Sequence, residues 1–321
     1  MHPIFGILSK ILFLACYIIH MFGRIKIEIC LSLTIVLFGT SCSQSPVPQF
    51  NENQAFGYLQ LQCQFGPRYP GSTGHQQCLE FLVKELKIKT DRVVEQPFMY
   101  TDSTNGKIHT LTNIIASFGN QGDRLLLCAH WDTRPWADYD PDPENRNKPI
   151  IGANDGASGV SVLLEIAQIL KNSPPPIGVD IILFDGEDSG DQNDVESWCL
   201  GSRYFARNKQ YDYMPRYGIL LDMIGDSDLH LPVERNSQRY VPKIVNLVWS
   251  KAEELGLRVF DRSLGNQIID DHLELLRVGI PIIDIIDFDY PYWHTLQDTE
   301  DKCSPKSLGI IGSLLVHLIY E

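Results

Sequence analysis

Short apolar runs that alternate with helical segments constrain the fold of this chain most. A continuous apolar run bounded by turn residues is typical of a strand buried on both faces of a sheet. Such strands are predicted within 123–129, 178–184, 217–222 and 281–286, and further extended segments at 92–100 and 108–118. Helical periodicity is expected at 52–65, 75–88, 156–170, 200–208, 238–255, 272–278 and 305–319, and a long loop at 132–150. This alternation predicts an α/β fold, a single domain whose mostly parallel central sheet is flanked by helices on both faces.

The first 42 residues have the pattern of a targeting segment. Basic Arg24 and Lys26 precede an apolar run, and small residues then lead to Cys42, as in a secretory signal with a lipoprotein processing site. We expect residues 1–20 to be a wrongly assigned extension, 21–42 a signal peptide with a lipid anchor at Cys42, 43–51 a tether and 52–321 the catalytic domain. An uncleaved membrane anchor is the alternative. Both interpretations predict an exported protein, either periplasmic or a membrane-anchored lipoprotein.

The net charge argues against nucleic-acid binding, and the cysteine pattern argues against a disulfide framework or a cysteine zinc site. The chain has 27 Lys and Arg against 40 Asp and Glu, a net charge of −13. A nucleic-acid-binding protein needs a basic face to replace phosphate counterions, so no nucleic acid is expected as a partner. The cysteines beyond residue 42 are odd in number and include no Cys-x-x-Cys pair, so neither a disulfide framework nor a cysteine zinc site is predicted. They are Cys63, Cys78, Cys128, Cys199 and Cys303.

Acids and histidines follow the predicted strands at the point where each strand ends. The residues concerned are His130, Asp132, Asp185, Glu187, Asp188, Asp222 and His294, with Asp155 at the start of a helix. Ligands of open α/β sheets bind outside the carboxyl ends of the strands, so these side chains should converge on one rim. Asp, Glu and His without Cys are the ligand types of catalytic zinc sites.

Each of these residues also has a simpler structural explanation. Asp155 and one of Asp270 and Asp271 could be helix N-caps, and His130 and His294 could be packed side chains. The adjacent pair Glu187-Asp188 could lie in a solvated loop, although two neighbouring acids repel each other unless a cation or a shared proton is present. It is the combination, in this order, that favours a catalytic site. Four other histidines are expected to be structural or exposed: His75, His109, His230 and His317.

The motifs around these residues resemble those of the zinc-dependent M28-type aminopeptidase superfamily. They are His130-Trp-Asp-Thr133, Gly152-Ala-Asn-Asp-Gly-Ala-Ser-Gly159, Asp185-Gly-Glu-Asp188, Leu221-Asp222, Asp271-His272 with Gly279-Ile-Pro281, and Trp293-His-Thr295. Within that superfamily the chain is most similar to glutaminyl cyclases of the animal type and their bacterial relatives. The supporting segments are Phe65-Gly-Pro-Arg-Tyr-Pro-Gly-Ser72, Asp270-Asp271-His272, Trp198 ahead of Gly201-Ser-Arg203, and the Trp before His294.

The resemblance implies a role for each matching residue. One zinc ion per chain would be held by Asp155, Asp188 and His294, and Glu187 would be the general acid and base, in a hydrogen-bond network with Asp222 and Asp270. Trp198 and Trp293 would line the substrate pocket. The substrate would be a peptide or protein with N-terminal Gln, converted to pyroglutamate with release of ammonia. Asp188 departs from the animal enzymes, which have Glu there, so its backbone must lie closer to the metal.

Two alternatives to this function are retained. A two-zinc aminopeptidase would use His130, Asp155, Asp188, Asp222 and His294 as ligands and hydrolyse the peptide bond; the cyclase interpretation instead expects hydrogen bonds to hold His130 and Asp222 away from the metal. The other alternative is an exported lipoprotein that binds peptides with an inactive peptidase fold. The retention of Glu187 and of the metal-binding residue types argues against it.

Overall fold

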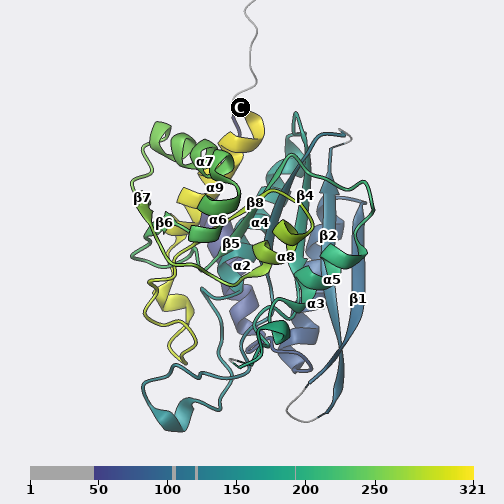
Figure 1. The fold of residues 1–321 in the computed structure, drawn as a ribbon, viewed down its shortest axis with the longest axis vertical. Helices are drawn as coiled ribbons and strands as arrows, with labels where there is room; N and C mark the ends of the chain where they lie inside the picture. The colour runs from purple at the N-terminus through teal and green to yellow at the C-terminus, as the bar shows by residue number, and fades with distance from the viewer. Residues whose placement is uncertain (1–46, 103–105, 120–121, 192) are drawn as a thin grey trace, which may run out of the picture. The chain divides into compact units, whose positions relative to one another are not determined.

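A six-stranded sheet forms the centre of the protein, in the order β1-β2-β4-β3-β5-β8 (Figure 1). The computed structural model describes residues 47–102, 106–119, 122–191 and 193–321. Strands β3, β4, β5 and β8 are parallel, while β2 runs antiparallel to its neighbours β1 and β4. The prediction of a mostly parallel sheet is therefore confirmed. The strands are β1 (Val93–Thr101), β2 (Ile108–Phe118), β3 (Arg124–His130), β4 (Gly178–Phe184), β5 (Tyr217–Asp222) and β8 (Ile282–Ile286).

The register of the parallel strands brings their carboxyl ends to one level. His130 at the end of β3 is paired with Phe184 at the end of β4. Asp222 at the end of β5 is likewise paired with Ile286 at the end of β8. Because all four strands end together, the residues that follow them share one rim of the sheet.

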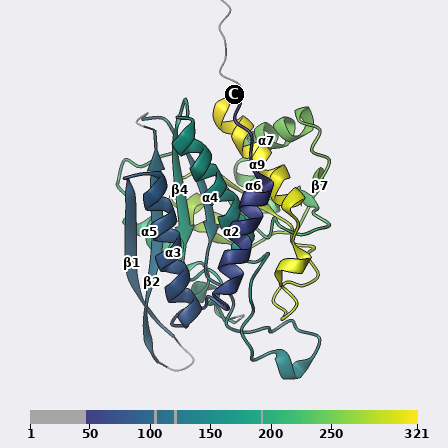
Figure 2. The same ribbon diagram turned by 180° about the vertical axis from the view of Figure 1, so that it is seen from behind.

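Helices cover both faces of the sheet, as predicted. Figure 2 shows one face with α2 (Glu52–Gln64), α3 (Thr73–Lys89), α4 (Ala157–Asn172) and α9 (Pro305–Tyr320). On the other face, in front in Figure 1, lie α5 (Leu200–Asn208) and α8 (Asp271–Arg277). Side chains alternate along each strand, so Leu127, Ile181 and Ile219 join the larger core under α4, and Leu126, Ile182 and Leu220 join the smaller one.

The region between β5 and α8 differs from the prediction. The single helix expected at 238–255 is two helices, α6 (Arg235–Tyr240) and α7 (Pro242–Glu254). The cause is Pro242, which lacks a backbone N–H and is suited only to the first turn of a helix. A second, two-stranded parallel sheet of β6 (Leu231–Val233) and β7 (Phe260–Leu264) was not predicted. Strand β7 is exposed beyond Phe260 and carries no apolar run that would indicate a strand.

The expected targeting segment, with Cys42, lies outside the described residues. Val47 and Phe50, in the expected tether, pack against the larger core, and the Phe50 ring occupies the space that a Cβ on Gly312 would need. Among the described helices, none has the length and apolarity to cross a bilayer. Cys63, Cys78, Cys128, Cys199 and Cys303 are all free thiols.

Candidate active site

Three predicted metal ligands come together at the rim of the sheet. One ligand atom each from Asp155, Asp188 and His294 lies within 4.8 Å of the other two. His294 Nε2 is 3.1 Å from Asp188 Oδ1 and 3.6 Å from Asp155 Oδ2. Asp155 Oδ2 and both carboxylate oxygens of Asp188 are buried without a hydrogen-bond partner. Burying such oxygens unpaired is unfavourable, so the trio fits a cation, and its two carboxylates and one imidazole suit zinc.

The charge balance of the trio leads to the same conclusion. Burial raises the pKa of Asp188 to about 6, and the negative charge of Asp155 adds to this, while His294 only partly opposes it. Burial lowers the pKa of His294, but Asp188 and Asp138 outweigh it and raise that pKa to about 9. Two buried acids around one imidazole therefore leave an excess of negative charge that a divalent cation would neutralise.

Special backbone geometry places two of the three predicted ligands. Asp155 precedes Gly156, whose φ of 100° brings its Cα so close to the Asp132 carbonyl that a Cβ would lie 2.5 Å from that oxygen. His294 has a φ of 53°, a left-handed conformation that is uncommon for a residue other than glycine, although histidine adopts it more often than most. Strained backbone of this kind persists only where the surroundings impose it, and it is concentrated at functional sites.

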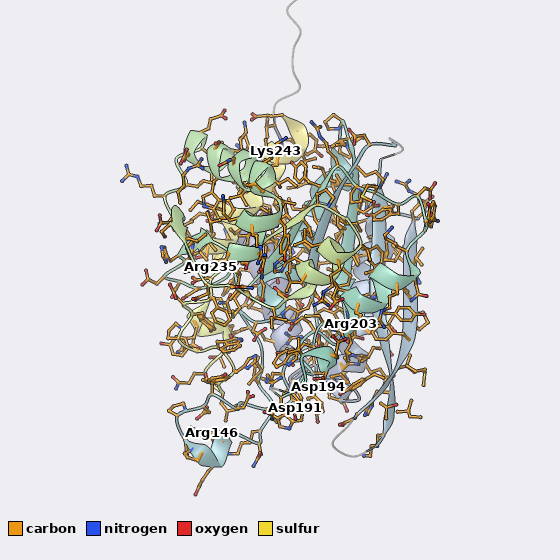
Figure 3. The ribbon with its side chains drawn as sticks, in the orientation of Figure 1. Arg146, Asp191, Asp194, Arg203, Arg235 and Lys243 are labelled. Atoms are coloured by element: carbon orange, nitrogen blue, oxygen red, sulfur yellow. The ribbon has the colours of Figure 1, made fainter. Side chains whose placement is uncertain are left out.

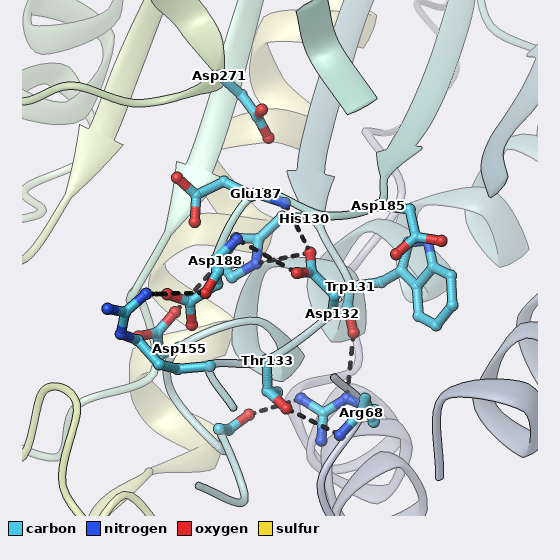
Figure 4. A network of polar contacts seen from close by, with 12 residues as sticks. Arg68, His130, Trp131, Asp132, Thr133, Asp155, Asp185, Glu187, Asp188 and Asp271 are labelled. Atoms are coloured by element: carbon cyan, nitrogen blue, oxygen red, sulfur yellow. Dashed lines mark hydrogen bonds and ion pairs between the residues drawn. The ribbon is translucent and has the colours of Figure 1, made fainter. Parts of the chain in front are cut away.

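Two buried aspartates accept hydrogen bonds from the backbone segments that carry Asp155 and Asp188. Asp132 accepts hydrogen bonds from the backbone N–H groups of Glu187 and Asp188, at 3.0 and 3.2 Å (Figure 4). Asp298 accepts in the same way from the N–H groups of Asn154 and Asp155, at 2.8 and 3.1 Å. Each carboxylate thus fixes the turn that carries one acidic ligand, and neither function could be read from the sequence motifs.

A second group of possible ligands lies beside the first. His130 Nε2 is 3.2 Å from Asp155 Oδ1 and 3.3 Å from Asp222 Oδ1. Ligand atoms of His130, Asp155 and Asp222 also lie within 4.8 Å of one another. Asp155 is therefore a member of both groups. The cyclase interpretation expects hydrogen bonds to hold His130 and Asp222 away from the metal; the two do contact each other, but His130 also contacts the predicted ligand Asp155.

Glu187 is buried next to the ligand trio and is not a member of it. Its side chain lies beside Asp270 and Cys199, and the Cys199 thiol donates to Glu187 Oε1 at 3.4 Å. Burial raises the pKa of Glu187 well above its usual value; the charge of His130 opposes this shift, and Asp270 and Asp188 reinforce it. Asp270 caps α8 by accepting from the Asp271 N–H. A carboxyl group with a raised pKa is suited to taking up and returning a proton near neutral pH.

The two predicted pocket tryptophans flank His294. The Trp198 ring is parallel to the imidazole within 5°, with centroids 6.2 Å apart, and the Trp293 ring lies 4.0 Å away at 29°. The Trp198 indole N–H donates to the Asp191 carbonyl at 3.0 Å, within the loop where Figure 3 labels Asp191 and Asp194. Tyr139, half exposed at 51%, packs on Trp293 with ring centroids 4.8 Å apart. Two indole rings therefore lie close to the imidazole at the rim.

Several residues at the rim were not predicted. Arg134, Asp138 and Tyr139 come from the long loop at 132–150, which has only one short 3-10 helix, η1 (Pro143–Asn145), and no periodicity that could single them out. His75, expected to be structural or exposed, is structural: it is buried, lies 2.9 Å from Asp185 and stacks on Trp131. Asp185, although part of a motif, is therefore paired with His75 and not with the ligand trio.

Comparison with known proteins connects this rim to a family. The model of peptidase family M28 matches residues 113–319. Bovine (Bos taurus) glutaminyl-peptide cyclotransferase is 25% identical over 289 residues, covering 79% of this chain and 78% of its own.

Solved structures from bacteria are more similar. A Bacteroides thetaiotaomicron glutaminyl cyclase bound to N-acetylhistamine is 39% identical with a TM-score of 0.82, and the match covers 86% of this chain and 99% of that one. A Zn-dependent exopeptidase from Parabacteroides distasonis has the same identity, TM-score and coverage. The chain therefore belongs to peptidase family M28, among relatives that are named glutaminyl cyclases as well as Zn-dependent exopeptidases.

Proposed function

We propose that the protein is a zinc-dependent glutaminyl-peptide cyclotransferase. It converts the N-terminal Gln of peptides or proteins to pyroglutamate and releases ammonia. The observation that carries this proposal is the buried Glu187, which adjoins the ligand Asp188 in the chain but remains outside the Asp155–Asp188–His294 group. The resemblance to proteins named glutaminyl cyclases, across most of the chain, supports it.

A single zinc ion would be held by Asp155, Asp188 and His294. Bound there, it supplies a Lewis acid that polarises the side-chain amide carbonyl of the substrate Gln. The two carboxylates with unpartnered oxygens and the imidazole are the ligand types that a catalytic zinc site would use.

Glu187 transfers the proton in this reaction. The α-amine of the substrate attacks the side-chain carbonyl carbon, a nitrogen–carbon bond forms, and the bond to the amide nitrogen breaks. Glu187 takes the proton that the amine loses and returns it to the departing nitrogen, so that ammonia leaves and no external nucleophile is consumed. Its raised pKa suits both halves of this transfer, and the nearby Asp270 contributes to that shift.

Trp198 and Trp293 hold the substrate in its folded-back conformation. Ring closure within one molecule depends mainly on keeping the amine close to the carbonyl carbon. Both indole rings stack near the His294 imidazole, with ring centroids 6.2 and 4.0 Å from it. A compact Gln side chain packed against the two indole rings would have few other conformations available.

A two-ion aminopeptidase remains the second candidate, because of one observation. His130, Asp155 and Asp222 also bring their ligand atoms within 4.8 Å, which is a donor set for a second ion. That enzyme would use Glu187 to activate water for hydrolysis of the peptide bond. Metal content and reaction products separate the two functions.

The test uses the purified protein, a Gln-peptide and a Leu-anilide. We expect ammonia release from the first, no cleavage of the second, and about one zinc per chain, as in a single open site. Glu187→Gln should retain zinc and lose turnover by about 100-fold or more, whereas Asp155→Ala should lose the metal. Glu165→Gln is the control, since Glu165 is also buried but faces Asn51 and Lys89. Cleavage of the anilide alone, with two zinc ions bound, would contradict the proposal.

We also propose that the protein is exported and anchored by a lipid on Cys42, in the periplasm or at a membrane. The basic and apolar pattern of residues 21–42 supports this. Labelling with a radioactive fatty acid should mark the wild type and not Cys42→Ala. Equal labelling of the two would contradict the anchor.

A further inference from the structure

The two ring nitrogens of His294 face different partners. Nε2 lies toward the ligand trio, 3.1 Å from Asp188 Oδ1 and 3.6 Å from Asp155 Oδ2. Nδ1 lies on the other side of the ring, 3.3 Å from Asp138 Oδ1. An imidazole binds a metal through one nitrogen only when the other carries its proton, and a carboxylate facing that proton selects this tautomer.

Asp138 is itself held in place by Arg134. The guanidinium makes a two-pronged contact, with Nε 3.0 Å from Asp138 Oδ1 and Nη2 2.7 Å from Oδ2. Its remaining nitrogen, Nη1, donates to the carbonyls of Asp188 at 3.0 Å and Gly190 at 2.9 Å. Arg134 is only 1% exposed, and a planar, buried fork of this kind has little freedom to move. The Arg134 guanidinium therefore connects the Asp138 carboxylate, which faces His294, to the backbone of the predicted ligand Asp188.

The backbone of the same segment also contacts His294. The N–H of Tyr139 donates to the His294 carbonyl at 3.2 Å. His294 has the left-handed φ of 53°, so its backbone conformation must be maintained by contacts of this kind. The long loop thus restrains both the main chain and the ring of the one histidine in the trio.

The arrangement at His130 differs. Its Nδ1 is 3.7 Å from Asp132 Oδ1, against 3.3 Å between His294 Nδ1 and Asp138 Oδ1. Both carboxylate oxygens of Asp132 already accept from the backbone of Glu187 and Asp188. The carboxylate that faces Nδ1 of His130 therefore holds a backbone turn, whereas the carboxylate that faces Nδ1 of His294 is held by the Arg134 side chain.

We propose that Asp138, held by Arg134, is a positioning residue that sets the tautomer and orientation of His294 for metal binding. Asp138 accepts the Nδ1–H and leaves the Nε2 lone pair directed at the ion. This inference rests on the proposed zinc centre of Asp155, Asp188 and His294. It assigns to the loop at 132–150 the function of completing that centre.

The test measures the zinc dissociation constant by competition with a chromophoric chelator. Asp138→Ala should weaken zinc binding 10- to 100-fold, the usual effect of losing a carboxylate behind a ligating histidine. Asp138→Asn keeps an acceptor oxygen and should bind more tightly than Asp138→Ala. Asp142→Ala is the matched control, because Asp142 is an exposed aspartate of the same loop that caps η1, and it should stay within about twofold of the wild type.

The melting temperature of the metal-free proteins separates positioning from folding. Because Asp138→Ala leaves the buried Arg134 without its carboxylate partner, its metal-free form should melt below the wild type. Zinc binding is therefore compared at a temperature at which the metal-free wild type and both Asp138 variants are folded. Wild-type zinc affinity in Asp138→Ala, or an Asp138→Asn that binds no more tightly than Asp138→Ala, would overturn the positioning function. If instead the wild type holds no zinc that Asp155→Ala removes, the proposed centre itself fails.

Discussion

Arg68 offers a direct test of how the rim is held together. The side chain is fully buried, and it donates to three carbonyl oxygens: that of Trp131 at 3.1 Å (Figure 4), that of Ile151 at 2.7 Å and that of Gly152 at 2.8 Å. Trp131 follows β3, and Ile151 and Gly152 lie just before Asp155. Arg68 therefore joins the end of a strand to the turn that carries a proposed metal ligand, and Arg68→Met would break that connection.

The size of the effect follows from these three bonds. A hydrogen bond to a charged group contributes about 1.5–3 kcal/mol net, and an unpaired buried carbonyl costs about 1–3 kcal/mol. Part of the loss is offset because a buried charge is also removed. We therefore expect Arg68→Met to lower the free energy of unfolding by about 3–5 kcal/mol. Arg68→Lys, which keeps the charge but lacks the planar fork, should lose less.

Urea-induced unfolding, followed by circular dichroism at pH 7, measures this change. Arg92→Met is the matched control, because Arg92 also donates to a carbonyl, that of Gly119, but is exposed. It should change the free energy of unfolding by less than about 0.5 kcal/mol. If Arg68→Met stayed within about 1 kcal/mol of the wild type, the bonds of Arg68 would not be holding the rim and the reasoning would be refuted.

Three further predictions concern the backbone, the pH and the metal. Gly156→Ala should lower both stability and zinc content, since a Cβ would lie 2.5 Å from the Asp132 carbonyl; thermal melting and elemental analysis measure this, and an unchanged zinc content would contradict it. Burial alone would raise the pKa of Glu234, but His272 and the N–H groups of Asn236 and Ser237 lower it to about 2, so its stabilisation is present above about pH 4.5 and is lost toward pH 2. Glu234→Gln should then be less stable than the wild type at pH 7 by about 2–3 kcal/mol and nearly equal to it at pH 2; urea midpoints at both pH values check this, and a constant difference would be inconsistent with it. Removal of zinc by a chelator should lower the melting temperature of the wild type but not of Asp155→Ala, and equal shifts would place the stabilising ion elsewhere.

The sheet and its rim could be predicted because their signals are local. Leu125, Leu126 and Leu127 mark a strand buried on both faces, and His130 and Asp132 follow directly where it ends. The same pattern recurs at β4, β5 and β8, so the convergence of the acids follows from parallel pairing alone. Asp155, Asp188 and His294 were accordingly expected to meet, and the structure brings them together.

The remaining features depend on contacts that have no local signal. Asp138 is one of several acids in a loop without periodicity, and only the fold brings it to His294, 156 positions further along the chain. Asp298 supports Asp155 from a similar distance in sequence. By contrast, the break between α6 and α7 had a local signal in Pro242, and the apolar pattern around it concealed that signal.

Asp155 belongs to both groups of possible ligands at the rim. The first group also contains Asp188 and His294, and the second contains His130 and Asp222. A substitution at His130 or Asp222 changes only the second group, whereas a substitution at Asp155 removes a carboxylate from both groups. Asp155 Oδ1 faces His130 and Oδ2 faces His294. The side chain therefore couples the two groups, since it cannot shift toward one of them without leaving the other.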